Sequence, residues 1–335
     1  MTIKKKIFFL FVFFLLIFGA VEITGLIVSY RFNLNVARFG VPMLVDADNI
    51  LKDKKLFWKF KPFNTFTSRW ESAGEIKINR QGWRDTDFAI DKPAGLKRIA
   101  LIGDSSTFGY RRKYNEIFAN ILENKLNELK LSGFDWDVQN YGVPGYTIHQ
   151  GLVVLNDYAL QYKPDYVIIM FGINDSRPVP FNDDEYQSKA QSDNNKLDKY
   201  LQKLFSYKIF MSLYFKTLER RLISQNTKPR VSLEKYAEIL NQFREITIAD
   251  NIKFIPMTQP YNQQLTDTPF VHRLKTYNEL LRKFCAEKSI EYIDIEKIFT
   301  DYYNQHKRDF IWDSCHPDAE GNIFISELII DLLNK

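Results

Sequence analysis

Cysteine is scarce in this chain of 335 residues, which holds only Cys285 and Cys315. Two cysteines cannot build the disulfide framework of a small secreted domain, although one bridge stays open to them in an oxidising compartment. No His-x-x-x-His or Cys-x-x-Cys spacing occurs either, which disfavours a metal site. We therefore expect neither a metal nor another cofactor in this protein.

Histidine is also rare, and the chain has four of them: His149, His272, His306 and His316. A histidine that removes a proton needs a carboxylate that fixes its tautomer and stabilises its charged form. Only His316 follows an acid by three residues, and this acid is Asp313. The stiff Pro317 comes directly after the histidine. The pattern predicts that Asp313 and His316 act together from one loop.

A large excess of charge of one sign is lacking, because 46 basic residues face 41 acidic ones and the net charge is +5. The lysines are scattered, and no nucleic-acid-binding motif is present, so we expect no nucleic-acid partner. One basic run, 111–113, either attracts an anionic substrate or forms a solvated loop.

The most informative stretch that is present follows the apolar run 99–102, which is typical of a buried parallel strand. A glycine breaks this run, and Asp104 and Ser105 fall at its carboxyl end, where open α/β sheets bind their ligands. A serine hydroxyl becomes a good nucleophile only when a base takes its proton. Ser105 therefore forms a candidate catalytic triad with Asp313 and His316.

Two later segments offer donors for the oxyanion that develops when a serine attacks an ester. The segment 140–147 contains Gly142 and Gly145, and at either glycine a backbone N–H could approach a ligand closely. Asn174 follows the apolar run 166–171, and its side-chain amide can donate a hydrogen bond. The alternatives are a structural turn at the glycines and a helix cap or turn at Asn174.

These four blocks, in this order, resemble the SGNH (GDSL-type) hydrolase superfamily, and the resemblance covers about residues 97 to 333. It implies that Ser105 is the nucleophile and that Asp313 and His316 complete the triad. The sequence departs from the family's pattern at Ser106, where a leucine is usual.

The resemblance also assigns the oxyanion hole. It implies that the backbone N–H of Ser105, the backbone N–H of Gly145 and the amide of Asn174 hold the oxyanion. Gly145 matches better than Gly142, because the family's second block commonly runs asparagine, four residues, glycine.

The expected activity is that of a serine esterase that hydrolyses carboxylic esters of a lipid or an acylated glycan, as a deacetylase or a lipase-like enzyme. Two alternatives stay open. An O-acyltransferase would pass the acyl group to a cell-envelope glycan through the same triad. A non-catalytic, membrane-anchored binding protein could keep the fold, although the intact triad argues against it.

The N-terminus carries a long hydrophobic run, 7–30, with a single charge at Glu22 and three lysines before it at 4–6. At about 1.5 Å per residue the run spans roughly 36 Å, enough for a bilayer core of about 30 Å. The lysines favour a cytoplasmic N-terminus, so the rest of the chain is expected in the periplasm or at the cell surface. We predict an uncleaved single-pass anchor over 1–32. The alternative is a signal peptide with the apolar core 7–18, removed on secretion.

An accessory segment, 33–96, follows the anchor and is expected to contain short strands. It includes the passage Asn-x-x-Gly-aromatic-Arg at 79–84, and membrane-anchored bacterial members of the superfamily often carry a similar one. The segment also contains three tryptophans, Trp58, Trp70 and Trp83. Packing over a sheet edge is favoured for it over substrate binding by the tryptophans.

The hydrolase domain is predicted to span 97–335 and to alternate between strand and helix. Apolar runs predict strands at 99–102, 136–139, 166–171, 254–257 and 292–295. Helical periodicity predicts helices at 116–131, 148–162, 233–249, 276–288 and 319–333. About five parallel strands with helices on both faces would form an α/β, flavodoxin-like three-layer α/β/α sandwich, and the resemblance implies the same fold.

An insertion at about 183–230 interrupts this alternation. It contains a predicted helix over 197–222, in which apolar and basic residues are interleaved. Three roles are open to this helix: a lid over the site, a basic amphipathic helix on anionic lipid, or a helix docked onto the core by its apolar face.

Overall fold

The computed structural model of the protein describes residues 2–32, 49–67, 74–179, 182–192, 201, 204–223 and 228–335. Trp70 and most of residues 197–203, which belong to the predicted insertion helix, lie outside the described residues.

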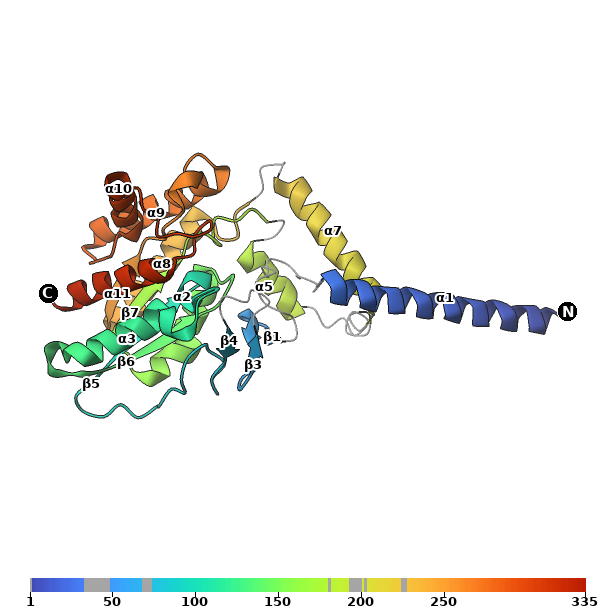
Figure 1. Ribbon diagram of the computed structural model, residues 1–335, viewed down its shortest axis with the longest axis horizontal. Helices are drawn as coiled ribbons and strands as arrows, with labels where there is room; N and C mark the ends of the chain where they lie inside the picture. The colour runs from blue at the N-terminus through green and yellow to red at the C-terminus, as the bar shows by residue number, and fades with distance from the viewer. Residues whose placement is uncertain are drawn as a thin grey trace.

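A four-stranded parallel sheet forms the centre of the molecule (Figure 1). Its strands stand in the order β6-β5-β7-β8. Their bounds are β5 Leu96–Gly103, β6 Asp135–Gly142, β7 Tyr166–Met170 and β8 Lys253–Met257. Strand β6 lies on one side of β5, and the chain then crosses to place β7 on the other side. The topological switch point therefore lies at the carboxyl ends of β5 and β7, where such sheets bind ligands.

The fifth strand that the apolar run 292–295 predicts is reduced to one parallel bridge between Met257 and Ile293. Helix α10, Ile295–His306, begins immediately afterwards. Asp294 caps this helix, because its carboxylate accepts the Lys297 N–H. The cap ends the extended backbone before a longer strand can form.

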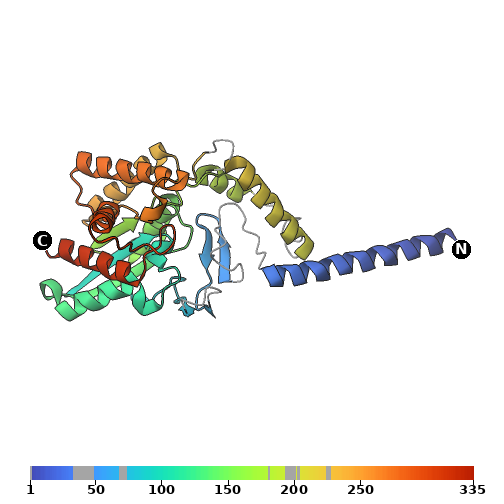
Figure 2. The ribbon, with the colours of Figure 1, turned by 45° about the horizontal axis from the view of Figure 1, so that its top comes forward.

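Helices cover both faces of the sheet (Figure 2). One face carries α3 Phe118–Leu129, α10 and α11 Ala319–Leu333, and the other carries α4 Ile148–Val154, α8 Leu233–Ala249 and α9 Pro269–Lys288. Strand β5 shows the cause: Ile99 and Leu101 pack on the first face, and Ala100 and Ile102 on the second. The predicted three-layer sandwich is confirmed.

The helix bounds differ from the predicted ones where caps or distortions intervene. Helices α8 and α11 match their predictions. Helix α9 begins at Pro269 rather than at residue 276, because Thr268 caps it and a proline suits its first turn. The predicted helix 148–162 is an α-helix only over α4, and continues as a π-turn, Leu155–Ala159.

The accessory segment forms two antiparallel strand pairs, β1 Ile50–Asp53 with β2 Phe57–Phe60 and β3 Thr65–Thr67 with β4 Glu75–Lys77. Trp58 and Trp83 are only 1% and 3% exposed. The Trp58 ring lies 5.4 Å from the ring of Tyr146, whose hydroxyl donates to the Trp58 carbonyl at 2.5 Å. Both tryptophans are thus packed inside the protein.

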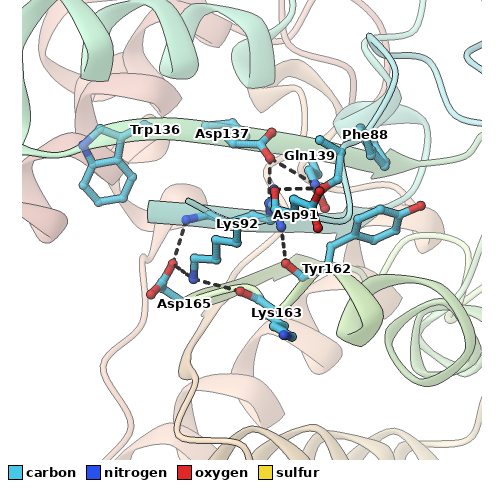
Figure 3. Close-up of polar contacts among 12 residues, drawn as sticks. Phe88, Asp91, Lys92, Trp136, Asp137, Gln139, Tyr162, Lys163 and Asp165 are labelled. Atoms are coloured by element: carbon cyan, nitrogen blue, oxygen red, sulfur yellow. Dashed lines mark hydrogen bonds and ion pairs between the residues drawn. The ribbon is translucent and has the colours of Figure 1, made fainter. Parts of the chain in front are cut away.

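A polar network ties the end of the accessory segment to the sheet, at the amino end of β5 (Figure 3). Arg98 is fully buried, and its guanidinium donates to Asp137 at 2.6 Å and to the Tyr162 carbonyl. Asp165 accepts the Arg98 N–H at 2.7 Å and the Lys92 ammonium at 2.5 Å. The network lies at the opposite end of the strand from Ser105.

Helix α1, Ile3–Phe32, projects from the rest of the molecule (Figure 1). Over Ile3–Val28 it is long and apolar enough to cross a membrane, with a mean hydropathy of 2.6 and no burial of its most apolar 18 residues inside the protein. By itself this helix is compatible with a membrane anchor or with a signal sequence.

The insertion contains α5, Asp183–Ser192, and α7, Phe205–Ile223. Helix α7 begins against α1, where Gly25 is buried under Phe205. The Glu22 carboxylate accepts the N–H groups of Phe205 and Ser206 at 2.6 and 3.2 Å, and also the Ser206 hydroxyl. The single charge of the apolar run therefore caps the first turn of α7.

Candidate functional site

The nucleophile turn lies at the carboxyl end of β5. Helix α2, Ser105–Phe108, begins directly after it, and Asp104 caps the helix by accepting the Ser106 N–H at 2.8 Å. The predicted Ser105 stands at the first position of α2 and is 3% exposed. The turn thus presents a serine at the switch point of the sheet.

Ser105, His316 and Asp313 form one hydrogen-bonded chain. His316 Nε2 lies 2.8 Å from Ser105 Oγ, and His316 Nδ1 lies 2.7 Å from Asp313 Oδ2. The other Asp313 oxygen accepts the N–H groups of Cys315 and His316 at 3.0 and 2.9 Å. The structure thus brings the three predicted residues together and fixes the carboxylate by its own loop.

The surroundings of His316 in this hydrogen-bonded triad favour its charged form. Burial alone lowers the pKa of His316, but the neighbouring Cys315 and the hydrogen-bonded Asp313 raise that pKa to about 10. Burial raises the pKa of Asp313, yet the hydrogen bond and the charge of His316 bring it below its usual value. The pair is therefore suited to hold a proton taken from the serine.

Ser106, the departure from the family's pattern, also joins the two loops. Its Oγ donates to the Cys315 carbonyl at 3.3 Å. The hydroxyl thus links the nucleophile turn to the loop that carries His316. A leucine could not make this contact.

The two candidate glycines differ in the state of their backbone N–H. The Gly142 N–H donates to Asn140 Oδ1 at 2.9 Å, and a Cβ at Gly142 would lie 2.3 Å from the Phe108 nitrogen. Gly142 therefore permits close packing of α2. Gly145 has a φ of +83°, which favours glycine, and its buried N–H makes no hydrogen bond within the described part of the chain. Of the two, Gly145 has the N–H that is left to donate.

Asn174 connects the nucleophile turn to the glycine block. Its Nδ2 donates to Asp104 Oδ2 and to the Tyr146 carbonyl, both at 3.1 Å. These acceptors belong to the neighbours of Ser105 and Gly145, so the amide lies between the two blocks. It must exchange one of these bonds before it can donate to an oxyanion.

Gln259 is a site residue that the sequence did not reveal. Its Nε2 donates to Asp104 Oδ2 at 2.8 Å, and its Oε1 accepts the Ile173 N–H at 2.7 Å. Asp104 is fully buried, and this burial raises its pKa. The one available signal was the position of Gln259 just past the carboxyl end of β8.

A buried ion pair was missed as well. Asp183 and Arg230, the ends of the predicted insertion, are 4% and 2% exposed, and Arg230 Nε lies 2.9 Å from Asp183 Oδ1. Arg230 Nη1 donates to the Gly145 carbonyl at 2.6 Å, and the Thr147 hydroxyl donates to Asp183 Oδ2 at 2.6 Å. We call the Asp183–Arg230 pair the insertion clip. It holds the Gly145 peptide from its carbonyl side.

Potential metal ligands among the described residues gather at the same loop. One ligand atom from each of Asp313, Cys315 and His316 lies within 4.8 Å of the others. His316 Nδ1 and Asp313 Oδ2 face each other, and His316 Nε2 faces Ser105. A metal ion would have to break the hydrogen-bonded chain. Both cysteines, Cys285 and Cys315, are buried and form no disulfide.

Residues 101–322 match the model of the GDSL-like Lipase/Acylhydrolase family. Among curated proteins, none matches the sequence.

Similar solved structures include the lipase/acylhydrolase from Enterococcus faecalis, with 21% identity over 71% of this chain and 95% of that chain and a TM-score of 0.49. A catalytic mutant of an acetylxylan esterase from Geobacillus stearothermophilus has 17% identity over 71% of this chain and 94% of that chain, with a TM-score of 0.49. The acetyl xylan esterase AlAXEase has 14% identity over 70% of this chain and 98% of that chain, with a TM-score of 0.50. At such low identities the likeness concerns the fold alone.

Proposed function

Because the chain belongs to the GDSL-like lipase/acylhydrolase family and is thereby a hydrolase of ester bonds, we propose that Ser105 is its nucleophile, His316 its general base and Asp313 the carboxylate that orients the base. The unbroken hydrogen-bonded chain, with 2.8 Å from serine to histidine and 2.7 Å from histidine to aspartate, carries this proposal.

The reaction follows from this geometry. Ser105 Oγ attacks the carbonyl carbon of a carboxylic ester while His316 Nε2 takes the hydroxyl proton. Asp313 stabilises the imidazolium that forms, and His316 gives its proton to the departing alcohol. Water then attacks the acyl-enzyme with His316 as its base, and His316 returns this proton to Ser105 Oγ as the carboxylic acid leaves.

The oxyanion is held by the backbone N–H groups of Ser105 and Gly145. Neither group has an acceptor in the part of the chain that the structure describes, and buried N–H groups without partners are rare. Asn174 supplies a third donor once its amide exchanges one of its present acceptors for the oxyanion. A single donor of this kind is worth about 10²–10³ in kcat.

A fluorophosphonate probe tests for the activated serine. We expect the full chain in detergent to be labelled covalently and the Ser105→Ala variant not to be labelled, because the probe reacts with a serine whose proton is taken by a neighbouring base. Ser106→Ala is the matched control, since it removes the adjacent buried hydroxyl and is expected to keep the label. Labelling that survives in Ser105→Ala would contradict the assignment.

The hydrolase domain lies outside the cytoplasm, held by α1 as an uncleaved anchor. The lysines at 4–6 precede the apolar run, which favours this orientation. The Glu22 cap supports retention of the helix, because cleavage after the apolar run would take the acceptor away from the N–H groups of Phe205 and Ser206.

Fractionation of a bacterial host tests the location. The full-length chain is expected in the membrane fraction after an alkaline wash, and protease added to spheroplasts is expected to digest the hydrolase domain. A shortened soluble chain in the periplasm or the medium would instead identify the run as a cleaved signal peptide.

A further inference from the structure

Two aromatic rings flank the imidazole of His316. The Tyr110 ring, from the loop after α2, lies 4.6 Å from the imidazole centroid. The Trp312 ring, from the loop that carries Asp313, is stacked on it at 6.3 Å. In the proposed mechanism His316 gives its proton to the departing alcohol, so groups beside His316 meet the alcohol part of the ester.

Two guanidinium groups converge on the same tryptophan. The guanidinium carbons of Arg111 and Arg112 lie 4.8 and 5.7 Å from the Trp312 ring centroid, and that of Arg111 also lies 5.5 Å from the Tyr110 ring. Both arginine side chains are half-buried, whereas the next cation along the chain, Lys113, is exposed. Two like charges therefore lie against one ring that itself stacks on His316, although like charges repel each other.

Buried donors in this cluster lack acceptors. Arg112 Nε and Trp312 Nε1 are both shielded from solvent and have no hydrogen-bond partner within the described residues. A buried donor without an acceptor costs about 1–3 kcal/mol. Acceptor oxygens, such as those of a ligand, are the groups that these donors lack.

The backbone of this loop is held in place. Arg84, 1% exposed, donates to the carbonyls of Gly109 and Arg112 at 2.7 and 2.6 Å. Arg111 has a φ of +60°, an uncommon conformation for a residue other than glycine. Because the loop is fixed by buried contacts, the two guanidinium groups are presented in a defined place, which a solvated basic loop would not require.

On these grounds, and resting on the proposed function, we propose that Arg111, Arg112 and Trp312 form a subsite for an anionic group, a carboxylate or a phosphate, on the alcohol part of the ester. The planar guanidinium matches both anions in a bidentate way, and the indole N–H adds a neutral donor. The subsite places the anion beside His316, so that the departing oxygen faces Nε2.

Three acetyl esters test the subsite: neutral methyl 4-acetoxybenzoate, 4-acetoxybenzoate and 4-acetoxyphenyl phosphate. We expect the full-length wild type to have a kcat/KM for at least one anionic ester about tenfold or more above that for the neutral ester, because charge-assisted hydrogen bonds are made only to the anion. The anionic ester with the higher kcat/KM shows whether the natural substrate carries a carboxylate or a phosphate.

Arg112→Gln is expected to lower this anionic-to-neutral ratio about tenfold while kcat/KM for the neutral ester changes by less than about twofold. The neutral ester thus reports that the variant is folded. Lys113→Gln is the matched control, because it removes the same charge from an exposed neighbour, and it is expected to keep the ratio. An unchanged ratio in Arg112→Gln, or an equal loss in both variants, would overturn the subsite.

A binding measurement separates this inference from the proposed mechanism. The alcohol products 4-hydroxybenzoate and 4-hydroxyphenyl phosphate are titrated into the Ser105→Ala protein, which needs no turnover. We expect the preferred product to bind at least about tenfold more tightly than to Ser105→Ala/Arg112→Gln. Equal affinities would overturn the subsite even if Ser105 is the nucleophile, and a difference would support it even if the esters are not turned over.

Discussion

Replacement of His316 by alanine is expected to lower kcat/KM for an ester by about 10⁴-fold or more. The reason is that Ser105 Oγ has its only close base in His316 Nε2, at 2.8 Å among the described residues. The measurement is steady-state hydrolysis of a chromogenic acetyl ester by the full-length protein. His306→Ala is the matched control, because this exposed histidine packs beside Tyr302, away from the triad's hydrogen bonds, and should leave the rate unchanged.

The pH profile of the wild type belongs to the same experiment. A protonated His316 cannot take the serine proton, so kcat/KM is low below the pKa of His316 and rises as the pH passes through it. Since Cys315 and Asp313 raise that pKa above the ordinary 6.5 against the effect of burial, the rise is expected on the alkaline side of 6.5. A rise centred at or below 6.5 would contradict the raised pKa, and a His316→Ala variant within about tenfold of the wild type would remove His316 as the base.

Replacement of Arg230 by methionine is expected to lower the free energy of unfolding by about 3–5 kcal/mol, because it leaves the Asp183 carboxylate buried without its counter-charge. The kcat is expected to fall as well, because Arg230 also holds the Gly145 carbonyl at 2.6 Å. Urea unfolding in detergent, followed by tryptophan fluorescence, measures the first effect.

Two further variants sharpen this test of the insertion clip. Lys228 lies two residues before Arg230 and forms an exposed ion pair with Glu185. Lys228→Met breaks this pair and is expected to change the free energy of unfolding by less than about 1 kcal/mol. Arg230→Met combined with Asp183→Leu is expected to recover part of the loss, because neither charge is then buried alone. A loss below about 1 kcal/mol in Arg230→Met would show that the clip does not stabilise the fold.

The sequence was sufficient for the elements that depend on local patterns. Apolar runs at 99–102 and 166–171 predict parallel strands, and their carboxyl ends share one edge of the sheet. Residues that directly follow such runs, Ser105 and Asn174, could therefore be expected near each other. The short spacing from Asp313 to His316 placed the acid and the base on one loop for the same local reason.

The contacts that position those residues join parts of the chain that are distant in sequence, and no periodic pattern predicts them. Gln259 reaches Asp104 across 155 positions, and Arg230 reaches Asp183 across 47. The predicted fifth strand is too long. The run 292–295 has the composition of a strand, but Asp294 within it caps the next helix, so the extended backbone stops there. A sequence pattern describes which face a residue occupies, whereas the partner of a buried polar group depends on the packed fold.

The contact between Glu22 and the first turn of α7 affects how the enzyme is oriented. With α1 in a bilayer, the continuous chain by itself would join that helix to the hydrolase domain at one place. The hydrogen bonds from Phe205 and Ser206 to Glu22 add a second point of attachment, and two points define an axis. If α1 spans a membrane, this second attachment limits how the domain, and with it the approach to Ser105, turns relative to the lipid surface.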